Sequence, residues 1–169
     1  VVRCRGGNAN CVGTLSLNQT VRGRTVGAGS VTGNAAGDHF WIFALDAASA
    51  AASAAGGLEL ALETCGAATD YDTYLRVLDA STGAELAAND DACGLNGLAS
   101  RVALPAGLAA GEYVALVEGY ASSEGDYALH FAARAVAAPS PAPTAPVPDR
   151  FVVSLGDCTA RGACFFSPN

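Results

Sequence analysis

The side chains best suited to chemistry are five oxygen-bearing groups on two neighbouring segments of the sequence. They are Asp70, Asp72, Asn89, Asp90 and Asp91. Because Ca²⁺ binds six to eight oxygen ligands of this kind, the group is a candidate calcium site, and calcium is the one cofactor that the sequence suggests. The D-x-D-x-D-G spacing of an EF-hand is absent. The alternative is that these side chains cap turns, with Asp72 accepting backbone N–H groups of residues 89–91.

Acid–base catalysis has few candidates in this chain. Only His39 and His130 have side chains that titrate near neutral pH. No G-x-S-x-G elbow, H-E-x-x-H motif or phosphate-binding loop occurs. Carboxylate pairs such as Glu118 and Glu124 are typical of the solvated surface of an acidic secreted protein. We therefore expect no catalytic residue and no enzymatic activity.

The six cysteines form an even set, which indicates an oxidising compartment and structural disulfides. Six cysteines permit 15 pairings, and proximity in the sequence favours Cys4–Cys11 and Cys158–Cys164. A zinc site at Cys4 and Cys11 is the weaker alternative, because no second Cys or His pair lies nearby at ligand spacing.

Composition excludes two classes of partner. The formal net charge is −7, the pI is about 4.6, and all nine positive charges are arginines, so we expect no binding to nucleic acid. No apolar run approaches the length of a membrane span. The absence of Met predicts a processed N-terminus, and the sequon at Asn18 is consistent with secretion and N-glycosylation.

Residues 69–94 must position the acidic group, and their pattern predicts two strands joined by a tight turn. Tyr71, Thr73, Leu75 and Val77 alternate with more polar residues, as in a half-buried strand. Residues 79–83, DASTG, have the composition of a turn, and residues 85–88 begin the return strand.

Seven further segments have the composition or alternation of strands. They are residues 14–21, 25–28, 38–45, 58–64, 100–104, 112–118 and 125–132. Residues 46–57 are rich in Ala and Ser without apolar periodicity, so we expect a loop with at most one helical turn. Eight or nine short antiparallel strands with regular turn signals predict an all-β fold, a β-sandwich with jelly-roll-like topology.

Three regions follow from composition. Residues 1–136 form the predicted sandwich, residues 137–148 a proline-rich linker that favours extended polyproline II, and residues 149–169 a short tail with two cysteines. The tail contains one apolar strand-like segment, whose apolar residues are Phe151, Val152, Val153 and Leu155.

An ordered series of short motifs in residues 37–132 resembles the bacterial pre-peptidase C-terminal domain and its relatives in algae. The matching segments are residues 40–43 (FWIF), 64–65 (TC), 71–75 (YDTYL), 89–91 (NDD), 111–119 (GEYVALVEG) and 125–129 (GDYAL). The resemblance implies a β-sandwich that serves as an accessory module of secreted proteins, and some related domains bind calcium, collagen or polysaccharide. It also implies a disulfide between Cys65 and Cys93.

The linker resembles the hydroxyproline-rich, O-glycosylated linkers of green-algal and plant cell-wall proteins. The candidate modified residues are Ser140, Thr144, Pro139, Pro141, Pro143 and Pro146.

These features together predict a structural subunit of an extracellular fibre or matrix, located at the cell surface or in the cell wall. Its partners would be other copies of itself, because the apolar tail segment could add to a sheet edge of a neighbouring copy. The alternative is that the tail folds back on its own sandwich. A second predicted function is a calcium-dependent glycan- or matrix-binding module, with Tyr74 and Tyr120 as the aromatic platform.

Overall fold

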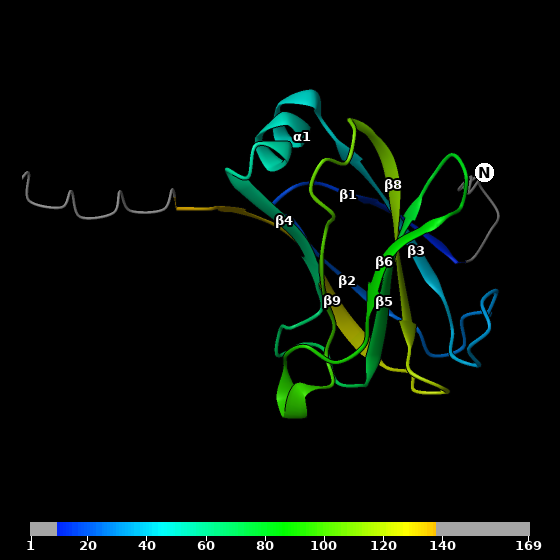
Figure 1. Ribbon diagram of the computed structural model, residues 1–169. Coiled ribbons are helices and arrows are strands. Elements are labelled where there is room, and N and C mark those ends of the chain that lie inside the picture. Colours follow the sequence, from blue (N-terminus) through cyan, green and yellow to red (C-terminus); the bar gives the residue numbers. More distant parts are fainter. Residues whose placement is uncertain (1–9, 138–169) are drawn as a thin grey trace, which may run out of the picture. The chain divides into compact units, whose positions relative to one another are not determined.

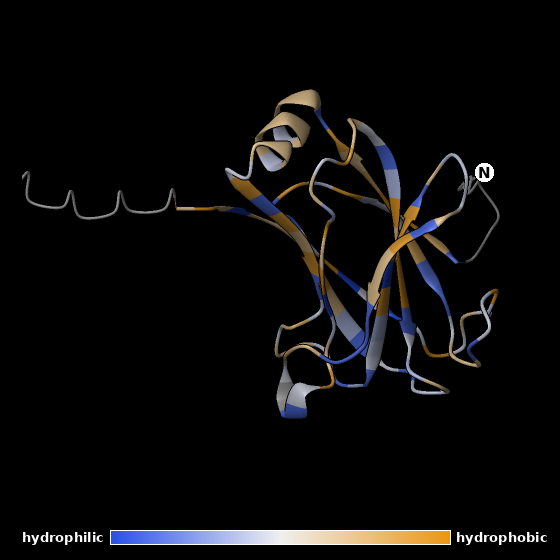
Figure 2. Ribbon diagram, viewed as in Figure 1, coloured by the Kyte–Doolittle hydropathy of each residue, from blue (hydrophilic) through white to orange (hydrophobic). Residues whose placement is uncertain are grey.

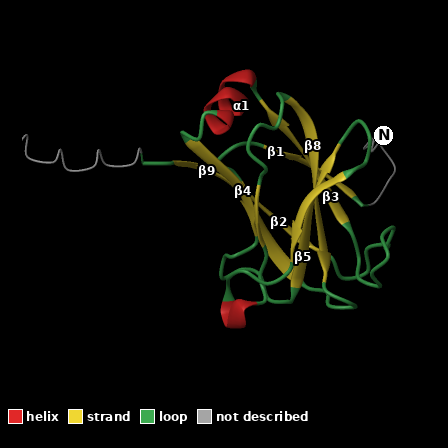
Figure 3. Ribbon diagram, viewed as in Figure 1, coloured by secondary structure: helices red, strands yellow, loops and turns green. Residues whose placement is uncertain are grey.

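The computed structural model describes residues 10–137, and every structural statement below refers to these residues. They belong to the first of two units into which the chain divides, Val1–Ala138. The linker from residue 138 and the tail of residues 149–169 lie outside the described residues. The described part contains nine strands in two sheets, with one α-helix and one short 3-10 helix at opposite ends of the sandwich (Figures 1 and 3). The predicted all-β sandwich is confirmed.

The first sheet, sheet 1, has five strands in the order β1-β3-β8-β5-β6. Their bounds are Cys11–Leu15 (β1), His39–Leu45 (β3), Gly111–Gly119 (β8), Thr73–Asp79 (β5) and Glu85–Asn89 (β6). β1 pairs with β3 in parallel, so the prediction that all strands are antiparallel is wrong at this edge. The reason is topological, because the chain crosses to the second sheet between β1 and β3 and returns in the same direction.

The second sheet, sheet 2, has four antiparallel strands in the order β2-β9-β4-β7. Their bounds are Thr20–Arg24 (β2), Asp126–Ala135 (β9), Leu58–Glu63 (β4) and Arg101–Ala103 (β7). β9 is longer than predicted because it pairs with β2 at its start and with β4 along most of its length.

The main hydrophobic core lies between the sheets, where apolar residues of alternate positions meet (Figure 2). The rings of Phe43 and Phe131 contact each other edge to face, with their centroids 4.8 Å apart. Trp41 is buried as predicted, and its indole N–H donates to the hydroxyl of Tyr127 at 2.7 Å. A smaller cluster of Phe40, Val114 and Leu116 lies on the outer face of sheet 1, so the central strand β8 is buried on both faces.

The predicted hairpin of residues 69–94 is confirmed as β5 and β6. In its turn, one carboxylate oxygen of Asp79 accepts the backbone N–H groups of Ser81 and Thr82, each at 2.8 Å. Hydrogen bonds from these two residues lower the pKa of Asp79 to about 2. Gly83 closes the turn with a φ of 77°, which favours glycine.

Residues 46–57 differ from the prediction, because α1 forms at Ala47–Ala54. Asp46 caps this helix by accepting the backbone N–H of Ser49 at 2.7 Å. The helix buries only Ala50 and Ser53, so it has no stripe of large apolar residues by which the sequence could reveal it.

The N-terminal strand predictions also need correction. Residues 14–21 are two strands separated by a turn in which Asn18 has a φ of 60°. Residues 25–28 are a turn, because the N–H of Ala28 donates to the carbonyl of Thr25 at 2.9 Å.

Candidate functional site

The acidic group lies around the end of the sandwich opposite α1, but its five members do not converge on one point. Asp70 accepts the backbone N–H of Asp126 at 2.8 Å, and Asn89 accepts that of Arg101 at 3.1 Å. Asp90 accepts the N–H of Asp91 at 2.9 Å. Among residues 10–137, no three or more His, Cys, Asp or Glu side chains are grouped so that they could hold a metal ion. Calcium binding therefore stays a prediction.

Asp72 is the unusual member of the group. Its Oδ1 atom is buried without a hydrogen-bond partner, so the predicted capping bonds from residues 89–91 are not present. Burial raises the pKa of Asp72, and the negative charges of Asp91 and Asp90 raise it further. Asp90 and Asp91 are thus the carboxylates of the group that act electrostatically on Asp72.

A network of buried hydroxyl groups holds the segment of residues 89–100 against both sheets. The hydroxyl of Thr73 lies 2.7 Å from that of Thr64 and 2.8 Å from that of Ser100. Ser100 also donates to the carbonyl of Thr73 at 2.6 Å and bonds the carbonyl of Asp90 at 3.1 Å. Because all three side chains are fully buried and hydrogen-bonded, they fix the position of the acidic residues.

The disulfide between Cys65 and Cys93, implied by the resemblance, is present beside this network. It joins the end of β4 to the segment after β6, across 28 residues of sequence. Cys11 is also disulfide-bonded. The other predicted cysteine partners, Cys4, Cys158 and Cys164, lie outside the described residues.

The two tyrosines predicted to form an aromatic platform differ in how accessible their rings are to a ligand. Tyr120 is 54% exposed, and its backbone N–H donates to the carbonyl of Asp72 at 3.0 Å, which places it next to the acidic residues. Tyr74 is half-buried, and the guanidinium of Arg76 lies over its ring at 4.4 Å from the centroid. One face of the Tyr74 ring is therefore already covered.

Neither histidine faces a catalytic partner in the described part of the chain. His39 Nδ1 lies 2.9 Å from the hydroxyl of Tyr127, and burial lowers its pKa. His130 Nδ1 lies 3.0 Å from both the hydroxyl of Thr20 and the carbonyl of Gln19. Both rings are hydrogen-bonded side chains of strands.

A buried carboxylate cluster was missed by the sequence analysis, which took Glu118 and Glu124 as solvated. Glu118 is fully buried, and it accepts from Arg76 Nε and from the hydroxyl of Thr32, each at 2.5 Å. Asp38 is also fully buried, and it accepts the backbone N–H groups of Val31 and Thr32 at 2.6 and 3.0 Å. The alternation of β8 places residue 118 on the outer face of sheet 1, but the loop of residues 29–38 that covers it could not be foreseen.

Glu124 is not a solvated carboxylate either. It accepts the backbone N–H groups of Gly37 and Gly27, at 2.9 and 3.4 Å, and so ties both ends of the loop between β2 and β3.

Asn18, the predicted N-glycosylation site, is exposed, and its Oδ1 accepts the backbone N–H of Ala133 at 3.1 Å. Its glycosylation stays a prediction. The candidate O-glycosylation residues (Ser140, Thr144, Pro139, Pro141, Pro143 and Pro146) and the assembly residues (Phe151, Val152, Val153 and Leu155) lie outside the described residues.

Comparisons with known proteins concern the fold alone. No family model and no curated protein matches the sequence. The solved structures that match include a 1.0 Å crystal structure of the pre-peptidase C-terminal domain of a collagenase from Bacillus anthracis. That domain is 13% identical to this chain, with a TM-score of 0.41, over 72% of this chain and 92% of that one. A match at this level assigns no site residue and no function.

None of the helices in residues 10–137 has the length and apolar character needed to cross a membrane.

Proposed function

We propose that the chain is a structural subunit of an extracellular fibre or matrix, in which the apolar segment of residues 151–155 adds to a sheet edge of the next copy. The observation that supports this proposal most directly is the chemistry of β1, an edge strand of sheet 1. Within the described residues, β1 pairs on one side only, with β3.

The four edge strands of the sandwich differ in their protection against strand addition. Natural edges are commonly protected by charged side chains or by being very short. β2 carries Arg22 and Arg24, β6 carries Glu85, and β7 has only three residues, one of them Arg101. β1 has the sequence CVGTL, without a charge, and residues 12–14 are all exposed. It is therefore the edge best suited to accept an added strand.

The linker is long enough for contact between copies. In the polyproline II conformation that their composition favours, at ~3.1 Å per residue, the 12 residues 137–148 would span roughly 37 Å. A domain of this size has a radius of gyration of roughly 14 Å. A segment carried at the end of such a linker reaches a neighbouring sandwich. A head-to-tail contact of this kind does not close on itself, so it generates a filament.

Negative-stain electron microscopy tests this proposal on the full chain and on a chain that lacks residues 149–169. We expect filaments from the first and monomers from the second. Thr14→Lys places a charge on β1 and should also abolish filaments, whereas the matched Ala103→Lys, on the exposed position of β7, should preserve them. Monomers from the full chain at high concentration would contradict the proposal. Filaments that persist in Thr14→Lys would move the acceptor to another edge.

A calcium-dependent glycan- or matrix-binding module is the second candidate function. It is favoured by one feature, the exposed ring of Tyr120 beside the unpartnered buried oxygen of Asp72. Aromatic rings stack on the apolar faces of sugars, and a carboxylate without a hydrogen-bond partner is suited to a cation. Calorimetric titration with Ca²⁺ of the wild type and Asp72→Asn, followed by glycan arrays with Tyr120→Ala, tests this candidate. No calcium uptake by the wild type would dismiss it.

A further inference from the structure

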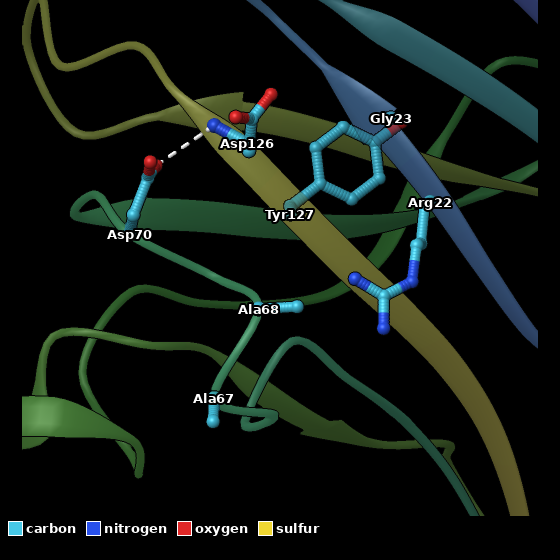
Figure 4. Close-up of a pocket in the computed structure, with 7 residues that line it drawn as sticks. All are labelled: Arg22, Gly23, Ala67, Ala68, Asp70, Asp126 and Tyr127. Carbon is cyan, nitrogen blue, oxygen red and sulfur yellow. Dashed lines mark hydrogen bonds between the residues drawn. The ribbon is translucent and has the colours of Figure 1, made fainter.

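A shallow cleft of about 370 Å³ lies on the outer side of sheet 2, between β2, the start of β9 and the segment that precedes β5 (Figure 4). Its lining residues are Arg22, Gly23, Ala67, Ala68, Asp70, Asp126 and Tyr127. The cleft is separate from the fibre proposal, since none of its lining residues belongs to β1.

Arg22 in the cleft differs from the other described arginines in having no ion-pair partner. The described arginines are Arg22, Arg24, Arg76, Arg101 and Arg134, and all of them except Arg22 form an ion pair. Arg22 is exposed, and its guanidinium reaches from β2 toward Ala68 across the cleft (Figure 4). The cleft therefore contains a guanidinium group that forms no ion pair with a carboxylate of the described residues.

The carboxylates of the cleft are already partly engaged. Asp126 pairs with Arg24 at 3.0 Å, which compensates its charge. Asp70 uses Oδ1 to accept the N–H of Asp126, and its other oxygen makes no hydrogen bond in the structure. The cleft thus offers one unpaired guanidinium with five N–H donors and one free carboxylate oxygen that can accept.

Small residues form two sides of the cleft, with Ala67 and Ala68 on one side and Gly23 on the other. A Cβ atom at position 23 would lie 2.3 Å from the hydroxyl of Tyr127, so this position has no room for a side chain. Because Tyr127 is buried and bonded to Trp41, this part of the cleft is rigid.

We propose that this cleft binds a sugar that carries a carboxylate, such as a uronic acid residue of an acidic polysaccharide. The planar carboxylate of the sugar matches the guanidinium of Arg22, which can donate two parallel hydrogen bonds to it. A sugar hydroxyl donates to the free oxygen of Asp70. A polyphosphate is disfavoured, since it would need several unpaired cations, and here one arginine is flanked by carboxylates. A neutral sugar would leave the guanidinium without an ion-pair partner.

The test uses the full chain and trigalacturonate as the probe, with ¹⁵N-resolved NMR titration at low salt. Wild type should show saturable shifts in residues 22–24 and 67–70, and the affinity should fall as salt is added. The methyl ester of the same trisaccharide keeps its shape without the charge and should bind at least tenfold more weakly.

Matched variants distinguish binding in the cleft from non-specific electrostatic attraction. Arg22→Gln should weaken trigalacturonate at least tenfold, and Asp70→Asn severalfold. Arg134→Gln removes the same charge from the exposed outer side of sheet 2, outside the cleft, and should bind like the wild type. The backbone spectrum of each variant reports whether it is folded. Absence of saturable binding to the wild type, equal binding of the methyl ester, or equal weakening by Arg134→Gln would each overturn the proposal.

Discussion

The hydroxyl cluster of Thr64, Thr73 and Ser100 joins the two sheets and carries no charge, whereas Asp38 and Glu118 bring carboxylates under the loop that covers sheet 1. Both clusters are fully buried. A hydroxyl group donates and accepts, so three of them satisfy one another and the nearby backbone. A carboxylate only accepts, so the second cluster depends on Arg76, on Thr32 and on backbone N–H groups.

Burial alone therefore does not determine how a polar cluster stabilises the fold. Stabilisation by the hydroxyl cluster should be insensitive to pH, because none of its members titrates. Stabilisation by the carboxylate cluster should vary with pH and should fail when one partner is removed. Four changes to the chain test this contrast, in decreasing order of their effect on stability.

Removal of the disulfide beside the hydroxyl cluster should have the largest effect. With a sequence separation of 28 between the cysteines, the loop-closure relation predicts that Cys65→Ala/Cys93→Ala lowers the free energy of unfolding by about 3.5 kcal/mol. Urea unfolding monitored by the fluorescence of Trp41 measures this loss. A loss below about 1 kcal/mol would mean that the hydroxyl network alone holds residues 89–100 in place.

Removal of Glu118 should lower the free energy of unfolding by nearly as much. Glu118→Ala leaves Arg76 and Thr32 without their buried acceptor, and we expect a loss of about 3 kcal/mol, reduced by the partial exposure of Arg76. Glu85→Ala removes the other, more exposed partner of Arg76 and should cost less than about 1 kcal/mol. Equal effects of the two substitutions would mean that the buried position of Glu118 confers no advantage.

These clusters also show what the sequence could and could not predict. The hairpin of β5 and β6 was predictable because its alternation and its turn residues are local signals. The disulfide between Cys65 and Cys93 followed from a resemblance, because proximity in the sequence does not favour it. The parallel pairing of β1 with β3 depends on the path of the chain through the other sheet, which no local pattern encodes.

The candidate sites were predictable to a smaller degree. Tyr120 and Asp72 were identified and lie together, but Asp70 and Asn89 point to other partners. Arg22 was not identified, because residues 14–21 were taken as one strand. Had β2 been recognised as Thr20–Arg24, its alternation would have placed Arg22 and Arg24 on the same outer face.

Removal of one hydroxyl group should have an intermediate effect. Thr73→Val keeps the shape of the side chain but leaves two hydroxyls and the N–H of Ser100 short of a partner, so we expect a loss of about 2 kcal/mol. Thr14→Val, at an exposed position of β1, is the matched control and should change stability by less than about 0.5 kcal/mol. If Thr73→Val unfolds no more easily than the control, the buried network adds nothing to stability.

The smallest effect, and the sharpest test of the contrast, is the dependence of stability on pH. Burial raises the pKa of Asp38 above 3.8, and the negative charge of Glu118 raises it further, although the N–H of Val31 opposes this. The folded state therefore holds a proton that the unfolded state has lost. The stability associated with this proton is complete below pH 3.8 and is lost as the pH rises through the folded pKa of Asp38. We expect the free energy of unfolding to fall over this range.

Asp38→Asn should remove this fall, because the amide oxygen still accepts from Val31 and Thr32 but does not titrate. Thr73→Val should lower the whole curve without changing its shape, since the hydroxyl cluster is neutral. Asp79 has the opposite effect, because its pKa is lowered to about 2 in the folded state. Its contribution to stability is therefore lost as the pH falls from 3.8 toward 2. Unfolding by urea between pH 2 and pH 7 distinguishes the wild type from these two variants. Parallel curves for the wild type and Asp38→Asn above pH 4 would remove the distinction between the two clusters, because both would then behave as neutral networks.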